Sequence, residues 1–151
     1  RDWSKMVAPS VEIPLSTNQR YQYVTLWSMV CAPFFFSCDI DQIDEFTVRL
    51  LANAGVVKIN QDELGQVAEV VRNKDDQVVM MKKLADGSQA VAVFNRNDKA
   101  EAVIELDWAD FGGCCIRSVY DVWRQKELGE MKGGFSVRLS PNGVGLFILT
   151  E

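Results

Sequence analysis

The fold is decided by one stretch of the chain, residues 26–65, with the sequence LWSMVCAPFFFSCDIDQIDEFTVRLLANAGVVKINQDELG. A helix that approaches Pro33 must stop there, because the residue before a proline disfavours the helical conformation. The run that follows, Phe34–Cys38, is short and apolar on both faces, as in a parallel-sheet strand that is covered on both sides. Asp44 then suits the N-cap of a second helix. The stretch therefore predicts one strand-plus-helix unit of a parallel barrel.

Both helices of this unit are predicted from caps and helical spacing. The first starts after Ser16, Thr17 or Asn18 and runs to about Ala32. Its expected buried stripe consists of Tyr21, Val24, Trp27 and Cys31. The second starts after Asp44, and its expected buried face consists of Phe46, Leu50, Leu51 and Ala54. Gly55 fits the left-handed position that ends many helices, so the second helix is expected to stop there.

After Gly65 the apolar pattern changes to a period of two, which is typical of strands. The predicted strands are Val67–Val71, Val78–Leu84, Ala90–Phe94, Ala102–Leu106, Ile116–Trp123, Phe135–Leu139 and Val144–Leu149. Turn residues separate them, so we expect an antiparallel β-sandwich of Greek-key type with about eight strands. The predicted fold class is α+β, with residues 1–65 from the end of a barrel and residues 66–151 forming the sandwich.

Composition narrows the class of protein. The chain has 151 residues, of which 48% are hydrophobic and 25% charged, as in a globular protein. Its net charge of −5 offers no basic surface for nucleic acid. It contains no apolar run near the roughly 20 residues that a membrane-spanning helix needs. The sequence opens at Arg1 without methionine or signal peptide, so we expect that its natural start is missing.

The absence of histidine removes several chemistries. Neither a Ser–His nor a Cys–His couple is available, and no metal can be held by histidine. The four cysteines include no Cys-x-x-Cys pair, so we predict no metal site and no cofactor. Cys31 and Cys38 flank an extended segment about 15 Å long, whereas a disulfide needs Cα atoms within about 7 Å. We interpret the cysteines as buried thiols.

Short motifs in the first part of the chain carry a specific resemblance. They are LWSM at residues 26–29, AP at 32–33, DI at 39–40, LLAN at 50–53 and INQDELG at 59–65. Together they resemble the last barrel unit of the α-galactosidases of glycoside hydrolase family 27. The second part resembles the C-terminal domain of that family through VFN at 93–95, VYDVW at 119–123 and PNGV at 141–144. The resemblance implies the end of a (β/α)₈ barrel followed by a β-sandwich.

Three residues depart from the family pattern. Gly55 stands where glutamate is frequent, Glu63 where proline is common, and Asn142 where histidine is usual. All three lie in predicted turn or cap positions, so they affect local geometry rather than the resemblance itself.

The resemblance implies an activity for a longer protein. Family members are retaining glycosidases that remove terminal α-linked galactose or a related sugar with two aspartates, a nucleophile and an acid/base. Both aspartates lie on earlier barrel strands, in motifs that this chain lacks. We therefore expect no catalytic residue here, an inactive isolated chain, and an α-galactoside as substrate of the intact enzyme. The family's frequent export favours a secreted or periplasmic protein.

Some residues of this chain are still candidates for the rim of the substrate pocket. Ser37, Cys38 and Asp39 follow the predicted strand, and barrel active sites lie at the C-terminal ends of strands. We interpret the wider acidic cluster, which adds Asp41, Asp44 and Glu45, as a polar loop and a helix cap. The triplet Asn60-Gln61-Asp62 is interpreted as satisfying backbone groups and fixing how the sandwich docks.

A second class of function, a non-catalytic carbohydrate-binding or interaction module, is the alternative. Aromatic side chains of the sandwich could stack on a sugar, namely Trp108, Phe111, Tyr120 and Trp123. We favour core or interdomain packing for them, because Tyr120 and Trp123 fall in a predicted strand with apolar neighbours.

A single barrel strand cannot form a barrel, which takes eight strands and about 250 residues. The two helices must therefore pack onto one of three surfaces. These are the sandwich, a second copy of the chain in a homo-oligomer, or a missing N-terminal barrel segment.

Overall fold

The computed structural model describes residues 15–32, 43–112 and 116–151. The predicted strand Phe34–Cys38 lies outside these residues. The described helices are α1 (Thr17–Met29), α2 (Glu45–Leu51) and α3 (Ala54–Asn60), with a short 3₁₀ helix at Trp108–Phe111. The strands are β1 (Glu69–Lys74), β2 (Gln77–Lys83), β3 (Gln89–Asn95), β4 (Ala102–Asp107), β5 (Ile116–Asp121), β6 (Lys126–Lys132), β7 (Gly134–Leu139) and β8 (Val144–Thr150).

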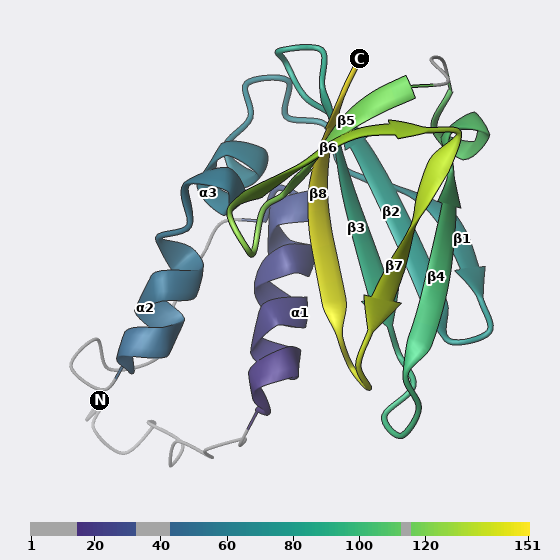
Figure 1. The fold of residues 1–151 in the computed structure, drawn as a ribbon. Coiled ribbons are helices and arrows are strands. Elements are labelled where there is room, and N and C mark those ends of the chain that lie inside the picture. The colour runs from purple at the N-terminus through teal and green to yellow at the C-terminus, as the bar shows by residue number, and fades with distance from the viewer. Residues whose placement is uncertain (1–14, 33–42, 113–115) are drawn as a thin grey trace, which may run out of the picture.

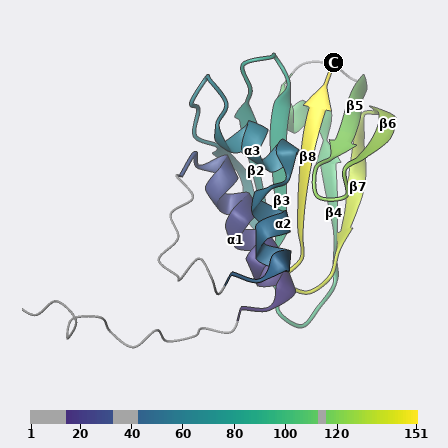
Figure 2. The same ribbon diagram turned by 90° about the vertical axis from the view of Figure 1, so that its left-hand side faces the viewer.

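The molecule has three layers (Figures 1 and 2). The middle layer is a six-stranded antiparallel sheet with the order β1-β2-β3-β8-β5-β6. The antiparallel pair β4–β7 covers one face of this sheet. The three helices cover its other face. The predicted fold class is confirmed. Three packing surfaces were considered for the helices, and α1 and α3 pack against one of them, the sandwich.

Strand β3 shows why this sheet needs both outer layers. All seven of its residues are buried. Ala90, Ala92 and Phe94 belong to the core between the helices and the sheet. Val91 and Val93 belong to the core between the two sheets. An antiparallel strand usually has one wet face, but here the helices cover that face, which explains the continuous apolar sequence AVAVF.

Helix α1 begins where the sequence predicts, but it buries a different face. Ser16 forms a capping box with Gln19, which fixes the start. The fully buried positions are Val24, Thr25, Ser28 and Met29, whereas Tyr21, Trp27 and Cys31 of the predicted stripe are only half-buried. The prediction is confirmed for Val24, but it missed Thr25 and Ser28 because it excluded polar residues. The Thr25 hydroxyl accepts a hydrogen bond from Trp123 at 2.9 Å, and the Ser28 hydroxyl donates to the Val24 carbonyl at 2.9 Å.

The predicted second helix is in fact two helices. α2 stops at Leu51, and Asn53 caps α3 by accepting hydrogen bonds from Gly55 N at 3.0 Å and Val56 N at 3.2 Å. Gly55 therefore lies inside the first turn of α3 rather than at a left-handed stop, and Ala54 is exposed. The capping ability of Asn53 overrode the helix propensity that would have joined the two segments.

Strand β6 was not predicted. Its sequence, KELGEMK, is polar, it is an edge strand, and none of its residues is buried. Gly129, at φ 88°, accompanies a register shift opposite Val119 and Tyr120, as in a β-bulge. An exposed edge strand carries no apolar alternation, so the period-two pattern does not reveal it.

In the described parts of the chain, no helix combines the length and apolar character needed to cross a bilayer.

Replacing Gly55 by alanine should destabilise the protein. The added Cβ would meet Val122 Cγ1 at 2.8 Å and Asn53 Oδ1 at 3.3 Å. Although alanine favours a helix over glycine by about 1 kcal/mol, overpacking should lower the free energy of unfolding by about 1–3 kcal/mol. Urea denaturation measures this change. In a Val122→Ala background, which removes the clashing methyl group, the same substitution should cost much less; equal costs in both backgrounds would contradict the packing explanation.

Candidate functional site

The predicted pocket-rim residues Ser37, Cys38 and Asp39 lie outside the described residues, as does Asp41. The structure does describe the two places where the chain enters and leaves this segment. The entry is the C-terminal end of α1, up to Ala32, and the exit is the N-cap of α2 at Asp44. The end of α1 and the N-cap of α2 therefore flank the candidate site, and their geometry is described below.

At the entry, every carbonyl in the last turn of α1 has a donor. Such carbonyls lack partners inside the helix and must find them elsewhere. The Leu26 carbonyl accepts from Val30 N, and the Trp27 carbonyl accepts from Ala32 N and Asn60 Nδ2. The Ser28 carbonyl accepts from Lys82 Nζ, and the Met29 carbonyl accepts from Ala68 N. Three of them, Asn60, Ala68 and Lys82, come from distant parts of the chain. We call this set of contacts the α1 junction.

Cys31 gives the junction its shape. Its φ of 54° is left-handed. The Cys31 N–H lies 3.4 Å from the Ser28 carbonyl, and the Ala32 N–H donates to the Trp27 carbonyl at 3.0 Å. These contacts form a Schellman motif, in which glycine is the usual residue. The Cys31 thiol donates to the Gln66 carbonyl at 3.2 Å and accepts from Lys82 Nζ at 3.3 Å. The side chain thus ties the helix end to the start of the sandwich.

Asn60 holds both sides of the turn after α1. Its amide nitrogen donates to the Trp27 carbonyl at 3.2 Å and to the Ala32 carbonyl at 2.9 Å. Asp62 accepts hydrogen bonds from Ala85 N at 3.0 Å and Leu64 N at 3.1 Å. Asn60 therefore joins α3 to the end of α1, and Asp62 joins the exit of α3 to the sandwich. Both satisfy backbone groups, as the sequence interpretation of this triplet holds.

Lys82 is the residue that the sequence reasoning missed. It is 1% exposed, and its ammonium donates to the Ser28 carbonyl at 3.1 Å, to Cys31 Sγ and to the Ile59 carbonyl. A signal was present in the sequence. Met80, Lys82 and Leu84 share one face of a period-two pattern, and the two flanking residues are buried in the core below the helices. A lysine between two apolar residues on one face is a candidate for burial.

At the exit, the acidic residues that the structure describes are structural. Asp44 accepts a hydrogen bond from Thr47 N at 2.8 Å and forms an ion pair with Arg20. The hydrogen bonds from Thr47, followed by that from Arg20, lower the pKa of Asp44 from 3.8 to about 2. Glu45 pairs with Arg49 on the exposed side of α2. Asp44 is thus the helix cap that the sequence predicts.

The aromatic residues of the sandwich form cores rather than a sugar platform. Trp108 and Phe111 are buried between the sheets, and Trp108 Nε1 donates to the Met131 carbonyl at 2.9 Å. Tyr120 and Trp123 pack at the helix–sheet core. Trp123 lies in the turn after β5 rather than in a strand, and its ring meets that of Tyr21 edge-on at 4.8 Å. The preference for core and interdomain packing is confirmed.

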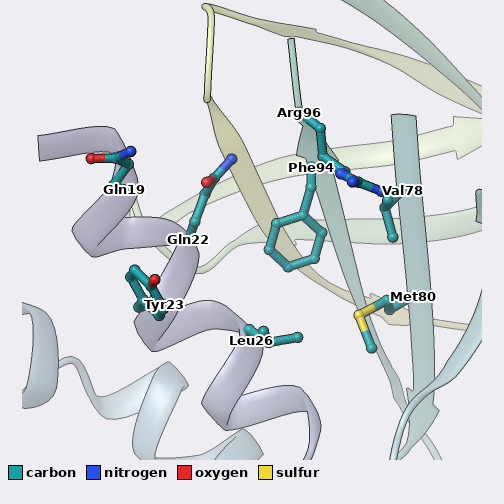
Figure 3. A pocket seen from close by; sticks show the side chains of 8 residues that line it. All are labelled: Gln19, Gln22, Tyr23, Leu26, Val78, Met80, Phe94 and Arg96. Carbon is teal, nitrogen blue, oxygen red and sulfur yellow. The ribbon is translucent and has the colours of Figure 1, made fainter. Parts of the chain in front are cut away.

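A groove of about 280 Å³ lies between α1 and strands β2 and β3 (Figure 3). Apolar side chains and two amides form much of its wall, and Arg96 lies at one end. The complete lining is Gln19, Gln22, Tyr23, Leu26, Val78, Met80, Phe94 and Arg96. Glycoside hydrolysis needs a pair of carboxyl groups, and this lining contains none.

A second groove beside α3 holds two carboxyl groups, Asp86 and Glu127. Asp86 pairs with Lys58 at 2.7 Å and accepts a hydrogen bond from Ser88 N at 2.9 Å. These contacts, first that of Lys58, hold the pKa of Asp86 well below its usual range. A general acid in a glycosidase needs a raised pKa. Asp86 therefore suits a structural ion pair and not proton donation.

Family models match both parts of the chain. Residues 74–149 match the model described as the alpha galactosidase C-terminal beta sandwich domain, which covers half of the chain. Residues 5–62 match the model described as alpha galactosidase A. A sandwich carrying helices on one outer face is thus the C-terminal architecture of a class of glycoside hydrolases. The chain belongs to the α-galactosidase family, glycoside hydrolase family 27.

Curated relatives are longer than this chain. The α-galactosidase of Cyamopsis tetragonoloba is 27% identical over 139 residues, which cover 90% of this chain and 33% of that protein. The α-galactosidase of Coffea arabica is 29% identical over 138 residues, covering 90% and 36%. The chain therefore spans about a third of the length of the curated relatives that it matches.

Solved structures share the fold. α-Galactosidase I of Mortierella vinacea superposes with a TM-score of 0.81 at 25% identity, over 89% of this chain and 35% of that chain. A family 27 β-L-arabinopyranosidase from Geobacillus stearothermophilus gives a TM-score of 0.81 at 30% identity, over 89% and 30%. A single-substitution variant of the latter enzyme has been solved in complex with arabinose.

Replacing Asn60 by aspartate should damage the α1 junction. The carboxylate has the shape of the amide but would face two carbonyl oxygens, those of Trp27 and Ala32, without donors. We expect the free energy of unfolding to fall by about 2–3 kcal/mol at neutral pH. Asn73→Asp on exposed strand β1 is the matched control and should change stability by less than about 0.5 kcal/mol. Equal effects of the two substitutions in urea denaturation would rule out this role.

The contribution of Asp44 should depend on pH. Its carboxylate is stabilised in the folded state, so wild type should be more stable than Asp44→Asn at neutral pH. The pKa falls from 3.8 to about 2 on folding, so this advantage should shrink as the pH drops through that window. Urea denaturation at a series of pH values measures it. High salt should reduce the difference, because the site is exposed; a difference constant across the window would refute the assignment.

Proposed function

We propose that this chain is the C-terminal part of a retaining glycoside hydrolase of the α-galactosidase type. Residues 1–65 would contribute the last unit of the catalytic barrel, and residues 66–151 the β-sandwich. In the whole protein the reaction would be hydrolysis of a terminal α-linked galactose or a closely related sugar. The observation that carries this proposal is the match of two α-galactosidase models to adjoining parts of the chain, residues 5–62 and 74–149.

The chain would supply the rim of the substrate pocket and not its reacting groups. Ser37, Cys38 and Asp39 follow the predicted strand, at the end where barrel active sites lie. Retaining hydrolysis needs two carboxyl groups about 5–5.5 Å apart. In this proposal both come from barrel strands outside this sequence, and no cofactor takes part.

The outer surface of the helices supports an interaction with the rest of a barrel. Tyr23 and Leu26 on α1 are 47% and 39% exposed, and Val48 on α2 is 50% exposed. Between α1 and α2 lies a largely apolar groove of about 290 Å³. Covering such side chains stabilises a complex, since each buried aliphatic or aromatic side chain contributes about 1.5–3 kcal/mol. The proposed partner is the N-terminal barrel segment of the same enzyme.

The choice of sugar would not reside in this part of the protein. An α-galactosidase and a β-L-arabinopyranosidase superpose on the chain equally well, each with a TM-score of 0.81. One described architecture therefore accompanies two named activities. We propose that loops on the earlier barrel strands select the sugar.

The test compares the whole protein with the isolated 151-residue chain. Both are assayed with nitrophenyl α-galactoside, α-N-acetylgalactosaminide and β-L-arabinopyranoside. We expect the whole protein to hydrolyse at least one of them with retention of anomeric configuration, and the chain alone to show no turnover. Turnover by the chain alone, or inactivity of the whole protein on all three, would overturn the proposal.

The same samples test the alternative of a carbohydrate-binding module. Tryptophan fluorescence of the isolated chain is followed during titration with galactose. Because Trp108 is buried and Trp123 is engaged by Tyr21 and Thr25, we expect no saturable change. Saturable binding by the isolated chain would favour the binding-module function.

A further inference from the structure

We propose that Cys31 and Lys82 form a modification site, at which a peroxide joins the two side chains by a covalent sulfur–nitrogen bond. The bond ties the end of α1 to strand β2, so it links the helical layer to the sandwich. This inference concerns the α1 junction and does not depend on the proposed function.

The two reacting atoms are already in contact in the folded chain. Lys82 Nζ lies 3.3 Å from Cys31 Sγ, although 51 residues separate the two in sequence. Lys82 is held in strand β2, where its partner on β3 is Ala90. Cys31 is held by the Schellman motif, through its own N–H and that of Ala32. The fold therefore presents one side-chain nitrogen to one sulfur in a fixed arrangement.

No acid holds the Lys82 nitrogen away from the sulfur. The residue is 1% exposed, although lysine is almost never fully buried unless it is paired. No ion pair among the described residues includes it. Its acceptors are the carbonyls of Ser28 and Ile59 and the Cys31 sulfur. Peroxide leaves backbone carbonyls unchanged and oxidises a thiol, so the sulfur is the one described acceptor that an oxidant turns into an electrophile.

The two side chains differ in their access to solvent, in the order that the reaction needs. Cys31 is half-buried and is a free thiol, so a small oxidant reaches its sulfur. Exposure is one of the features that make a cysteine susceptible to oxidation. Lys82 is closed to solvent, so its nitrogen faces the sulfur and the two carbonyls and not bulk water. The oxidised sulfur therefore meets the Lys82 nitrogen within the junction.

The reaction consumes one molecule of hydrogen peroxide for each bond. The Cys31 sulfur attacks one peroxide oxygen, the O–O bond breaks, and a sulfenic acid and one water form. The Lys82 ammonium passes a proton to water, and its nitrogen attacks the sulfur. The S–O bond then breaks, and the leaving hydroxide takes a second proton from the nitrogen to form a second water. The sulfur loses two electrons and the peroxide gains two, and the product is a sulfenamide that an added thiol reduces.

Such a bond restricts how the two layers separate. The Ala68 N–H donates to the Met29 carbonyl at 2.9 Å within the same junction. Hydrogen exchange at this amide requires that the linker leave the end of α1, and a covalent bond across the junction limits that opening. We expect the Ala68 amide to exchange about tenfold more slowly in the oxidised protein, with the amides of β3 unchanged. Equal exchange at Ala68 in the two samples would overturn this role of the bond.

The experiment treats the whole protein with hydrogen peroxide, removes the excess with catalase and maps the tryptic peptides by mass spectrometry. Trypsin does not cleave after a lysine whose nitrogen is bonded to sulfur. We therefore expect residues 21–49, which contain Cys31, to be linked to residues 75–83, which contain Lys82. The linked pair should weigh less than the two peptides together by two hydrogen atoms, and dithiothreitol should release both peptides.

Variants and a denatured sample assign the bond to these two atoms. Cys31→Ser and Lys82→Met should give no linked peptides, whereas Lys83→Met, which alters an exposed neighbour, should give them as wild type does. Wild type oxidised in urea should also give none, because unfolding separates the two atoms; this control holds even where a variant fails to fold. An unreacted Cys31, a Cys31 oxidised without a link, a link to Lys83, or a link that also forms in urea would overturn the proposal.

Discussion

The carbonyl groups at the end of α1 are the constraint on which the rest of the structure depends. A helix leaves its last carbonyls without internal partners, and buried carbonyls must still be paired. Here the partners come from α3, from the linker after it and from strand β2, through Asn60, Ala68 and Lys82. Forming these bonds requires that the helices and the sandwich fold against each other. The helical segment and the sandwich are therefore one cooperative unit at this point.

Much of the fold could be predicted from local patterns. The capping side chains of Ser16 and Asp44 indicated where two helices begin. Runs with a period of two predicted seven of the strands. The predictions failed where tertiary contacts determine which residues are buried or which segment forms a strand. Helix α1 buries Thr25 and Ser28 because hydroxyl partners exist for both, and β6 lacks any apolar pattern because it is an exposed edge. Such features depend on neighbours distant in sequence.

The site was less predictable than the fold. Asn60 and Asp62 could be assigned a structural role because short polar side chains at a helix exit commonly bind backbone groups. Lys82 could not be separated from Lys83 by residue type. Its position between Met80 and Leu84 in the period-two pattern was the available signal, and the register of β2 against β3, with Lys82 opposite Ala90, places it on the face below the helices. Residues 37–39 lie outside the described residues, so their proposed role still rests on the resemblance and on the strand-end position.

The double coverage of β3 has a consequence for any attempt to separate the two halves of the chain. The boundary in sequence near residue 65 is not a boundary in packing, because Ala90, Ala92, Phe94 and Leu146 face the helices. A sandwich cut free at that boundary would carry a wet apolar sheet, which favours self-association. Grafting this sandwich onto a foreign barrel would succeed only if the new helices present a matching apolar face. Modular exchange in this architecture thus means exchanging helices and sandwich together.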